Sequence, residues 1–400
     1  MRLLFVADGR SPTSLSWIAH WLASGEEVHL VSTYPCEPIP GLASLTVVPV
    51  AGSGMAGPAR GRSARGVGGW LRRIGRPLRY LLGPVSLPQQ QRKFLARVRS
   101  VQPDLVHALR IPFEGMLASV TPAAIPLAVS IWGNDLTLHA GRSPWLAGLT
   151  RRTLRRADGL HADAGRDIRL AEKWGFQPGK PSLVVPGAGG IRTEAMQDLP
   201  DTDRIATLPA GLLVVNPRGQ RPGSLLQDVF FQSIPLVLAR VPQVHFICPA
   251  LQDDAQARQW VDSLGIGNAV QLWPQVPQPE LWALDRRSAV YVSPSIHDGT
   301  PNSLLEALAC GCFPVVGDIE SMREWIRDGE NGLLVDARSP QALADALVRA
   351  LTSPDLREAA KMQNARLIAE RAAYARCMAK AEAFYRAVIG NRKAPGSAPA

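Results

Sequence analysis

Short apolar runs alternate with longer amphipathic segments along the first half of the chain. Residues 3–7 and 28–32 are almost wholly apolar, and Leu15, Ile18 and Leu22 recur between them at helical spacing. Further apolar runs occupy residues 45–50, 104–109, 126–132 and 159–163. Strands that are apolar on both faces are typical of a parallel sheet covered by helices on both sides. The first half is therefore predicted to be a doubly wound α/β domain.

The same alternation resumes after a polar, helix-poor link around residues 191–209 and predicts a second α/β domain. A chain of 400 residues exceeds one ordinary hydrophobic core, which agrees with two domains. We expect an N-terminal domain at 1–195 and a C-terminal domain at 205–368, two doubly wound Rossmann-like units that face a cleft. Residues 369–388 are predicted to form a helix that packs back on the first domain, followed by a disordered tail at 389–400.

Basic residues are concentrated in one segment of the first domain. Residues 38–103 contain eleven Lys and Arg but no Asp or Glu, whereas the whole chain has a net charge of +10. Within the insertion at 51–93, residues 58–82 join a Gly/Arg stretch to an amphipathic segment with a Trp, although Gly75 and Pro77 weaken a helix there. Such a segment is typical of a helix on an anionic membrane surface. The alternatives are an arginine-rich helix docked on the domain, and a nucleic-acid site, for which no recognised motif is present.

Cysteine use and hydropathy bear on the compartment. Five cysteines, an odd number, are scattered along the chain, which favours reduced thiols and a cytoplasmic protein. Cys310 and Cys312 are better explained by packing than by a metal, because no second pair accompanies them. No apolar run reaches the roughly 18 residues needed to span a bilayer, and Asp8 comes too early for a signal peptide. We expect a cytoplasmic protein without a metal site, peripheral on the inner membrane face.

One helix of the second domain carries the first candidate chemistry. Pro301 suits its first turn, and Asp298 and Thr300 are natural caps before it. Its free N–H groups and positive dipole end would bind a phosphate. Glu306 lies about 1.5 turns further along, roughly 7–8 Å, so one ligand could reach both features. Glu306 either accepts two hydroxyls of a ribose or pairs with an arginine beneath the sheet.

A second phosphate-binding feature follows the strand at 212–215. Arg218 and Arg221 come directly after that strand, and the carboxyl ends of parallel strands are where ligands bind. Two cations there would hold a diphosphate and stabilise the charge that develops as it leaves. The alternative is a solvated basic loop.

These motifs carry a resemblance to a known family. Residues 289–335, AVYVSPSIHDGTPNSLLEALACGCFPVVGDIESMREWIRDGENGLLV, resemble the C-terminal signature of the family 4 retaining glycosyltransferases of the GT-B fold. That signature has two acidic residues, usually both Glu, where this chain has Asp298 and Glu306. First-half pieces resemble the family in the same order: ADGRSPTSLSWIAHWLASGEEVHLVS, PDLVHALRIPFEGMLAS, SIWGNDL and VVPGAGGI. The resemblance covers most of the chain except residues 51–93 and the tail.

The resemblance implies a role for each residue of the donor site. It implies that Glu306 holds the nucleotide ribose, that Asp298 contacts hydroxyls of the donor sugar, and that Arg218 and Arg221 neutralise the diphosphate. Arg221 precedes Pro222, where relatives usually have Lys before Gly. The backbone along phosphate and sugar would come from the residues between the two acids: Gly299, Thr300, Pro301, Asn302 and Ser303.

The first domain departs from the family at one position. Many relatives have His-Gly-Ser-Asp where this chain has Trp132-Gly133-Asn134-Asp135. Trp132 cannot share protons but can form a wall of the sugar site, and Asp135 remains as a polar group for sugar or acceptor. His107 and His139 are nearby candidates, but a lone histidine is more often a packed or surface residue.

The resemblance implies a retaining hexosyltransferase that uses a UDP or GDP sugar and no metal. The acceptor is predicted to be a glycan or lipid-linked molecule of the cell envelope, with a soluble small molecule as the alternative. The leaving diphosphate would take the proton from the acceptor hydroxyl on the same face of the sugar. A hydrolase is disfavoured because the two acids are arranged along a donor and not across one bond. A non-catalytic scaffold with the same fold is a further alternative, and a nicotinamide oxidoreductase lacks the Gly-rich fingerprint after the first strand.

Overall fold

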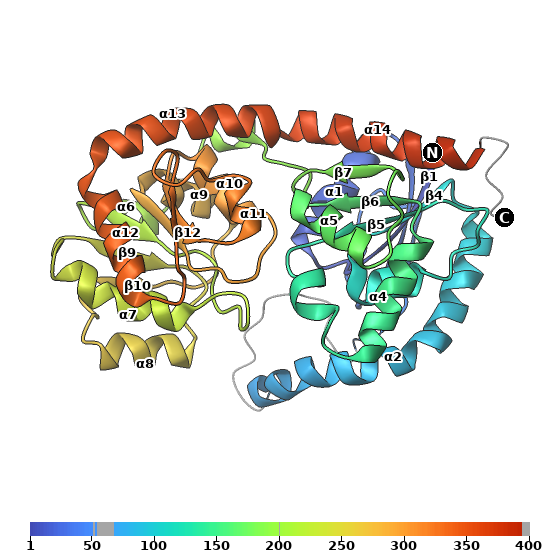
Figure 1. Cartoon of the computed structure of the whole chain (residues 1–400), viewed down its shortest axis with the longest axis horizontal. Helices are drawn as coiled ribbons and strands as arrows, with labels where there is room; N and C mark the ends of the chain where they lie inside the picture. The colour runs from blue at the N-terminus through green and yellow to red at the C-terminus, as the bar shows by residue number, and fades with distance from the viewer. Residues whose placement is uncertain (51–52, 54–67, 200, 394–400) are drawn as a thin grey trace. The chain divides into compact units, whose positions relative to one another are not determined.

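The structure is a computed structural model that describes residues 1–50, 53, 68–199 and 201–393, with backbone alone for residues 68–83, 392 and 393. The chain divides into two compact units. Unit 1 comprises residues 1–189 together with 378–400, and unit 2 comprises residues 190–377. Each unit is built around one parallel sheet with helices (Figure 1).

The sheet of unit 1 has seven parallel strands in the order β3-β2-β1-β4-β5-β6-β7. They are β1 (Arg2–Ala7), β2 (Glu27–Ser32), β3 (Ser44–Val47), β4 (Leu105–Ala108), β5 (Leu127–Ile131), β6 (Gly159–Ala162) and β7 (Ser182–Val184). The central strand β1 pairs with β2 on one side and β4 on the other, so that Leu3 lies opposite both Val28 and Leu105. Six of these strands, β1 to β6, overlap the predicted apolar runs, and all of them except β3 are largely buried.

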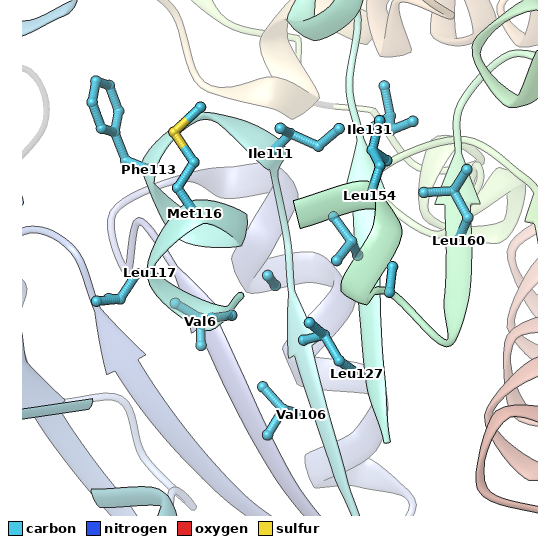
Figure 2. Close-up of a cluster of buried hydrophobic side chains, with 14 of the residues drawn as sticks. Val6, Val106, Ile111, Phe113, Met116, Leu117, Leu127, Ile131, Leu154 and Leu160 are labelled. Carbon is cyan, nitrogen blue, oxygen red and sulfur yellow. The ribbon is translucent and has the colours of Figure 1, made fainter. Parts of the chain in front are cut away.

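Helices cover this sheet and complete its core. They are α1 (Pro12–Ala23), α2 (Gly68–Val101), α3 (Met116–Ala118), α4 (Pro144–Arg156), α5 (Gly165–Lys173) and most of α14 (Tyr374–Lys393). Figure 2 shows how Ile111, Met116 and Leu117 gather over Val6 and other side chains of the sheet, all of them buried. Two short helical turns, Ile111–Gly115 and Asp135–His139, follow β4 and β5.

The backbone of helix α2 runs without interruption through Gly75 and Pro77, the two residues expected to weaken a helix there. The membrane-binding interpretation of residues 58–82 lies outside the residues whose side chains the structure describes. Among the described residues, no helix combines the length and the apolar character needed to cross a bilayer.

Helix α14 is anchored by a buried run of polar side chains. The indole N–H of Trp17 donates to the hydroxyl of Tyr385 (3.0 Å), and this hydroxyl lies 2.5 Å from Nδ1 of His107. Nε2 of His107 is 2.9 Å from Oγ of Ser130, and that oxygen is 2.8 Å from Nδ1 of His161. We call these five residues the histidine chain. It joins α14 and α1 to strands β4, β5 and β6.

The protonation of the histidine chain follows from its last acceptor. Nε2 of His161 lies 3.1 Å from the carbonyl oxygen of Val185 and must donate to it. Because burial lowers the pKa of His161, the ring is neutral at pH 7 and its Nδ1 accepts from Ser130. Ser130 then accepts from Nε2 of His107, whose Nδ1 accepts from the hydroxyl of Tyr385. Both imidazoles are therefore neutral. Burial lowers the pKa of His161 to about 4 and that of His107 well below its ordinary value.

The end of α14 also differs from expectation. The helix begins at Tyr374 and continues to Lys393, so residues 389–393, which we expected in a disordered tail, are helical. The approach of this helix to the sheet depends on Gly159, because a Cβ there would lie 2.3 Å from Cγ2 of Val388 and 2.9 Å from the ring of Phe384. Close packing against β6 stabilises the helix up to its last turns.

The sheet of unit 2 has six parallel strands in the order β10-β9-β8-β11-β12-β13. They are β8 (Leu213–Val215), β9 (His245–Cys248), β10 (Val270–Leu272), β11 (Val290–Ser293), β12 (Phe313–Gly317) and β13 (Leu333–Val335). Adjacent residues such as Val214 and Val215 belong to different apolar clusters, one on each face of the sheet. The strand order reverses between β8 and β11, and ligands of such sheets bind at this point of reversal.

The helices of unit 2 are α6 (Asp203–Ala206), α7 (Gln227–Leu238), α8 (Ala255–Ser263), α9 (Gln278–Arg287), α10 (Asn302–Ala309), α11 (Glu320–Arg323), α12 (Pro340–Thr352) and α13 (Pro354–Arg371). All five cysteines of the chain are free thiols. Cys310 and Cys312 are buried in an apolar cluster, as packing residues would be.

Candidate functional site

The loops that follow β8 and β11 bring together Arg218 and Asp298, which are 80 residues apart in the sequence. Nη1 of Arg218 donates to the Asp298 carboxylate and to Oγ of Ser295 (3.2 Å). Both charged side chains are largely buried, with 7% and 12% of their surface exposed. Burial works against the charge of Arg218, but the Asp298 carboxylate outweighs it, so the pKa of Arg218 lies above its ordinary value. The two residues therefore form a charged pair at the point of strand reversal.

A second set of contacts holds the loop that carries Arg218. Nε2 of Gln227 donates to the carbonyl oxygen of Gly219 (2.7 Å), while its Oε1 accepts from Nδ2 of Asn216 (2.7 Å). Gly219 has a φ of +57°, and a Cβ at this position would lie 3.2 Å from that of Ala250. The backbone beside Arg218 is thus held by buried amides and by a turn that favours glycine.

Arg221 occupies a different position from Arg218. Its side chain is exposed, and its Nε donates to the carbonyl oxygen of Arg218 (3.3 Å). The paired cations expected from the sequence are therefore unequal in this structure. Arg218 is buried against a carboxylate, and Arg221 lies at the surface.

The start of α10 corrects the expected cap. Pro301 is the N-cap residue itself and not part of the first turn, and its side chain makes no capping hydrogen bond. Asp298 instead accepts from the N–H of Gly299 (3.0 Å), and Thr300 accepts from the indole N–H of Trp325 (2.9 Å). Both expected caps instead form contacts within or near the loop before the helix. Trp325, which donates to Thr300, lies 25 residues further along the chain, so the local sequence pattern could not reveal this contact. The N-cap residue itself therefore satisfies none of the first N–H groups of α10.

Polar atoms at this helix mouth are arranged for a partner. Oδ1 of Asn302 is buried and has no hydrogen-bond partner among the described residues. Beside it, Oγ of Ser303 lies 3.1 Å from the hydroxyl of the buried Tyr291. Buried polar atoms in native proteins are nearly always hydrogen-bonded, so an orphaned amide oxygen at a helix N-terminus indicates a place where a ligand could bind.

Glu306 lies further along the same helix and is buried. Its Oε1 accepts from Nε2 of Gln278 at 2.5 Å. Burial raises the pKa of Glu306 to about 7, against the opposing effects of the neighbouring Gln278 and Trp282 side chains. Within the described residues its recorded hydrogen-bond partner is this amide and not an arginine, so the ion-pair alternative is not realised. A carboxyl group that titrates near neutral pH is typical of a functional site.

Asp285 is a second buried acid, which sequence reasoning missed. Neither of its carboxylate oxygens has a hydrogen-bond partner among the described residues. Its pKa is raised well above the ordinary value, first by burial and then by the charge of Glu306. The available signal was its position on α9, one turn after the apolar Leu281, on the side of the helix that faces the core. We call Asp285 and Glu306 the acid pair.

Trp132 and Asp135 lie in unit 1, directly after β5. The Asp135 side chain is wholly buried, accepts from Nε of Arg110 (2.8 Å) and receives the backbone N–H groups of Trp132 (3.2 Å) and Ile111 (3.4 Å). Burial raises the pKa of Asp135, against the opposing charge of Arg110. Asp135 thus positions two backbone segments, and its carboxylate is enclosed by them.

The Trp132 indole packs on the loop after β7. Its Nε1 would lie 3.2 Å from a Cβ placed on Gly187, so glycine is needed for this approach. The indole N–H is buried and has no acceptor among the described residues. His139 lies close by, and burial together with Arg110 and Arg142 lowers its pKa to about 3. His107, the other candidate, is a packed residue of the histidine chain.

Comparison with protein families gives two matches. A model described as "Glycosyl transferase 4-like domain" matches residues 9–187, and one described as "Glycosyl transferases group 1" matches residues 227–367. Similar curated proteins include a D-inositol 3-phosphate glycosyltransferase of Thermobifida fusca, 36% identical over 219 residues that make up 50% of this chain and 49% of the relative. A phosphatidyl-myo-inositol mannosyltransferase of Mycobacterium leprae is 28% identical over 191 residues, 47% of this chain and 50% of the relative. The chain spans about half the length of the curated relatives it matches.

Solved structures resemble the whole chain at low sequence identity. A sucrose-phosphate synthase from Thermosynechococcus elongatus superposes with a TM-score of 0.71 and 15% identity, covering 98% of this chain and 100% of its own. HepE from Anabaena, in complex with UDP and glucose, has a TM-score of 0.70 and 15% identity over 96% of this chain and 99% of its own. These likenesses show the GT-B fold, and the two family models lie on its two halves in the expected order. The chain therefore belongs to the family 4 type of glycosyltransferases with the GT-B fold.

Proposed function

We propose that this protein is a retaining glycosyltransferase that moves a hexose from a nucleotide diphosphate onto an acceptor hydroxyl. The observation that carries the proposal is the arrangement along α10. An uncapped helix mouth with an orphaned Asn302 amide stands at one end, and the buried carboxyl of Glu306 lies about 1.5 turns further on. This spacing suits a diphosphate at the mouth and a ribose at Glu306.

The raised pKa of Glu306 fits a role in ribose binding. A carboxylate that accepts two ribose hydroxyls is stabilised in its charged form, so the donor would favour the ionised state of Glu306. The backbone of residues 299–303 lies before and within the first turn of α10, where its N–H groups and the dipole favour the phosphates.

Arg218 and Asp298 would act on the reacting part of the donor. In the proposed reaction the bond between the sugar and the diphosphate breaks, and the acceptor oxygen bonds to the same carbon on the same face. The acceptor proton passes to the leaving phosphate oxygen. Arg218 stabilises the negative charge that develops there, with Arg221 as a second cation at the surface. Asp298, beside Arg218, accepts hydrogen bonds from hydroxyls of the donor sugar.

Unit 1 would contribute through Trp132. Its indole offers an apolar wall and one unsatisfied N–H, which suit a sugar face and a sugar hydroxyl. Asp135, which we expected to contact sugar or acceptor, is assigned instead to holding the backbone of Trp132, because its carboxylate is occupied by Arg110 and two N–H groups. The proposal needs no metal, since Arg218 and the helix mouth supply the positive charge.

The donor and the acceptor are proposed from the comparisons. UDP is the first candidate for the donor nucleotide, because HepE was solved with UDP and glucose, and GDP is the second. The named relatives act on an inositol phosphate or on phosphatidylinositol. We propose a lipid-linked or glycan acceptor of the cell envelope and a cytoplasmic location, peripheral on the inner membrane face. A soluble acceptor is the alternative.

Calorimetry with UDP, GDP and ADP tests the donor site. We expect one nucleotide to bind, and Glu306→Ala to weaken its binding about 10- to 100-fold, the value of hydrogen bonds to a charged group. Glu358→Ala is the matched control, because Glu358 is an exposed acid on α13 of the same unit, and it should leave the affinity unchanged. Absence of binding by every nucleotide would support a non-catalytic scaffold. Equal binding by wild type and Glu306→Ala would remove Glu306 from the site.

A further inference from the structure

Helix α4 of unit 1 has an outer face whose composition differs from the rest of the described surface. Trp145 is 53% exposed and is the only exposed aromatic side chain among the residues whose side chains the structure describes. Leu146, Thr150 and Leu154 form the inner face and are buried. Singly exposed apolar side chains are common on protein surfaces, so Trp145 is informative only through the residues around it.

Basic residues surround this Trp. Residues 136–157 contain five arginines and no Asp or Glu. Arg152 is seven residues after Trp145 and so lies on the same stripe of the helix, with Arg155 beside it; both are exposed. The outer face of α4 is therefore defined by Trp145, Arg152 and Arg155, with Arg142 exposed just before the helix.

The acids that flank this stretch do not neutralise it. Asp135 precedes it and is buried against Arg110, and Asp158 follows it and is buried against Arg156 at 2.7 Å. The positive charge of the outer face therefore has no compensating acid within the helix or at either of its sequence boundaries.

A neighbouring helix extends this surface. Helix α2 packs against α4, and the two lie side by side in Figure 1. The part of α2 with described side chains exposes Val85 (61%), Arg92 and Lys93, and the stretch 38–103 that contains it has no acidic residue. Two acid-free helices thus meet on one side of unit 1.

We propose that the outer face of α4 is a docking surface for an anionic phospholipid bilayer. Trp is favoured at the boundary between lipid headgroups and acyl chains, and arginines around it would lie among the anionic headgroups. This inference extends the proposed function, since an enzyme that docks here would meet a lipid-linked acceptor at the membrane surface. It concerns residues outside the segment 58–82, and it requires no turnover to be tested.

Co-sedimentation of the full chain with vesicles tests the surface. Vesicles of phosphatidylcholine with about a third phosphatidylglycerol are compared with phosphatidylcholine alone, at low salt and at about 0.5 M salt, which shortens the Debye length to a few ångströms. We expect binding to the anionic vesicles that high salt removes. Trp145→Ser should weaken it about tenfold, and Arg152→Gln about fivefold, the value of one basic residue at such a surface.

Matched controls come from unit 2. Met362→Ser removes an exposed apolar side chain (64%) on α13, and Arg258→Gln removes an exposed arginine on α8; both should bind as wild type does. Binding that is unaffected by both α4 substitutions would overturn the proposal. The proposal would also be overturned if the α4 variants lost binding to single-stranded RNA while they still bound vesicles as wild type does. Calorimetry with UDP on the same variants should show unchanged affinity, so a failed membrane surface can be told apart from a failed donor site.

Discussion

The histidine chain of unit 1 and the acid pair of unit 2 are both buried polar groups, but they differ in how far they are satisfied. In the histidine chain every donor meets an acceptor, from the indole of Trp17 through to the carbonyl of Val185. In the acid pair, Glu306 has Gln278, while both oxygens of Asp285 have no partner among the described residues. The histidine chain is therefore expected to stabilise the folded protein, whereas the acid pair is expected to destabilise it.

The difference separates a structural network from a site. A satisfied buried network stabilises one arrangement of the chain, and losing one member leaves the others unpaired at about 1–3 kcal/mol each. An unsatisfied acid costs stability in the free protein and is retained only where something else selects for it, most often a ligand. The acid pair stands on α9 and α10 beside the proposed donor site, whereas the histidine chain holds α14 on its sheet.

The largest expected effect is the response of the histidine chain to acid. Because the pKa of each imidazole is lower in the folded state than the unfolded value of 6.5, the folded protein binds fewer protons, and its stability is complete above pH 6.5 and falls as the pH falls. Each neutral histidine contributes a loss of about 1.4 kcal/mol per pH unit, so the two together lose about 5 kcal/mol between pH 6.5 and 4.5.

Urea unfolding at a series of pH values measures this loss, and a variant isolates it from the titration of surface acids. His161→Gln can still donate to one neighbour and accept from the other, but it no longer titrates. Its stability should therefore fall less steeply with pH, by about 1.4 kcal/mol per unit. Equal slopes in wild type and His161→Gln would contradict the neutral assignment.

The next effect comes from removing a single oxygen from the histidine chain. Tyr385→Phe leaves the N–H of Trp17 and Nδ1 of His107 without their partner inside the core. We expect a loss of about 1–3 kcal/mol in the free energy of unfolding at pH 7.5, measured by urea denaturation. Tyr34→Phe is the matched control, because that side chain is only half-buried and water can replace lost hydrogen bonds; its effect should stay below about 0.5 kcal/mol. If Tyr385→Phe left the free energy of unfolding unchanged, the histidine chain would not be what holds α14.

The fold could be predicted from the sequence, but the contacts within these two regions could not. Alternating apolar runs were sufficient to predict two doubly wound domains, because a strand that is buried on both faces has an apolar sequence whatever its partners are. The same reasoning proposed Arg218 and Asp298 as candidate site residues but not as a pair. The two are 80 residues apart, and their contact depends on how β8 and β11 are ordered in the sheet. The histidine chain was equally hidden, because Tyr385 and His107 are 278 residues apart.

Predictions from neighbouring residues failed where a residue distant in sequence made the contact instead. Thr300 was expected to cap α10 because it stands just before the helix, yet it bonds to Trp325, a partner that only the fold brings close. Asp285 was missed for a related reason. One acid on an otherwise apolar helix face predicts neither what surrounds it nor whether it is charged, and both depend on the packing of α9 against α10.

The smallest expected effect has the opposite sign and tests the acid pair. Because burial raises the pKa of Asp285 well above its ordinary value, the folded protein keeps this proton to a higher pH than the unfolded chain, which loses it above a pH of about 3.8. The wild type therefore loses stability from this group as the pH rises through that value, and Asp285→Asn, which cannot ionise, removes the loss. The linkage gain, about 1.4 kcal/mol per pH unit over the range in which only the folded state holds the proton, is reduced by the cost of burying an unpaired amide. We expect a net stabilisation of about 1 kcal/mol at pH 7, which shrinks as the pH approaches 4. Glu280→Gln on the same helix should instead destabilise, because Arg204 and Thr202 bind that carboxylate at 2.7 and 3.2 Å. If Asp285→Asn destabilised the protein as Glu280→Gln does, Asp285 would be a bonded structural acid, and the distinction between the two regions would fail.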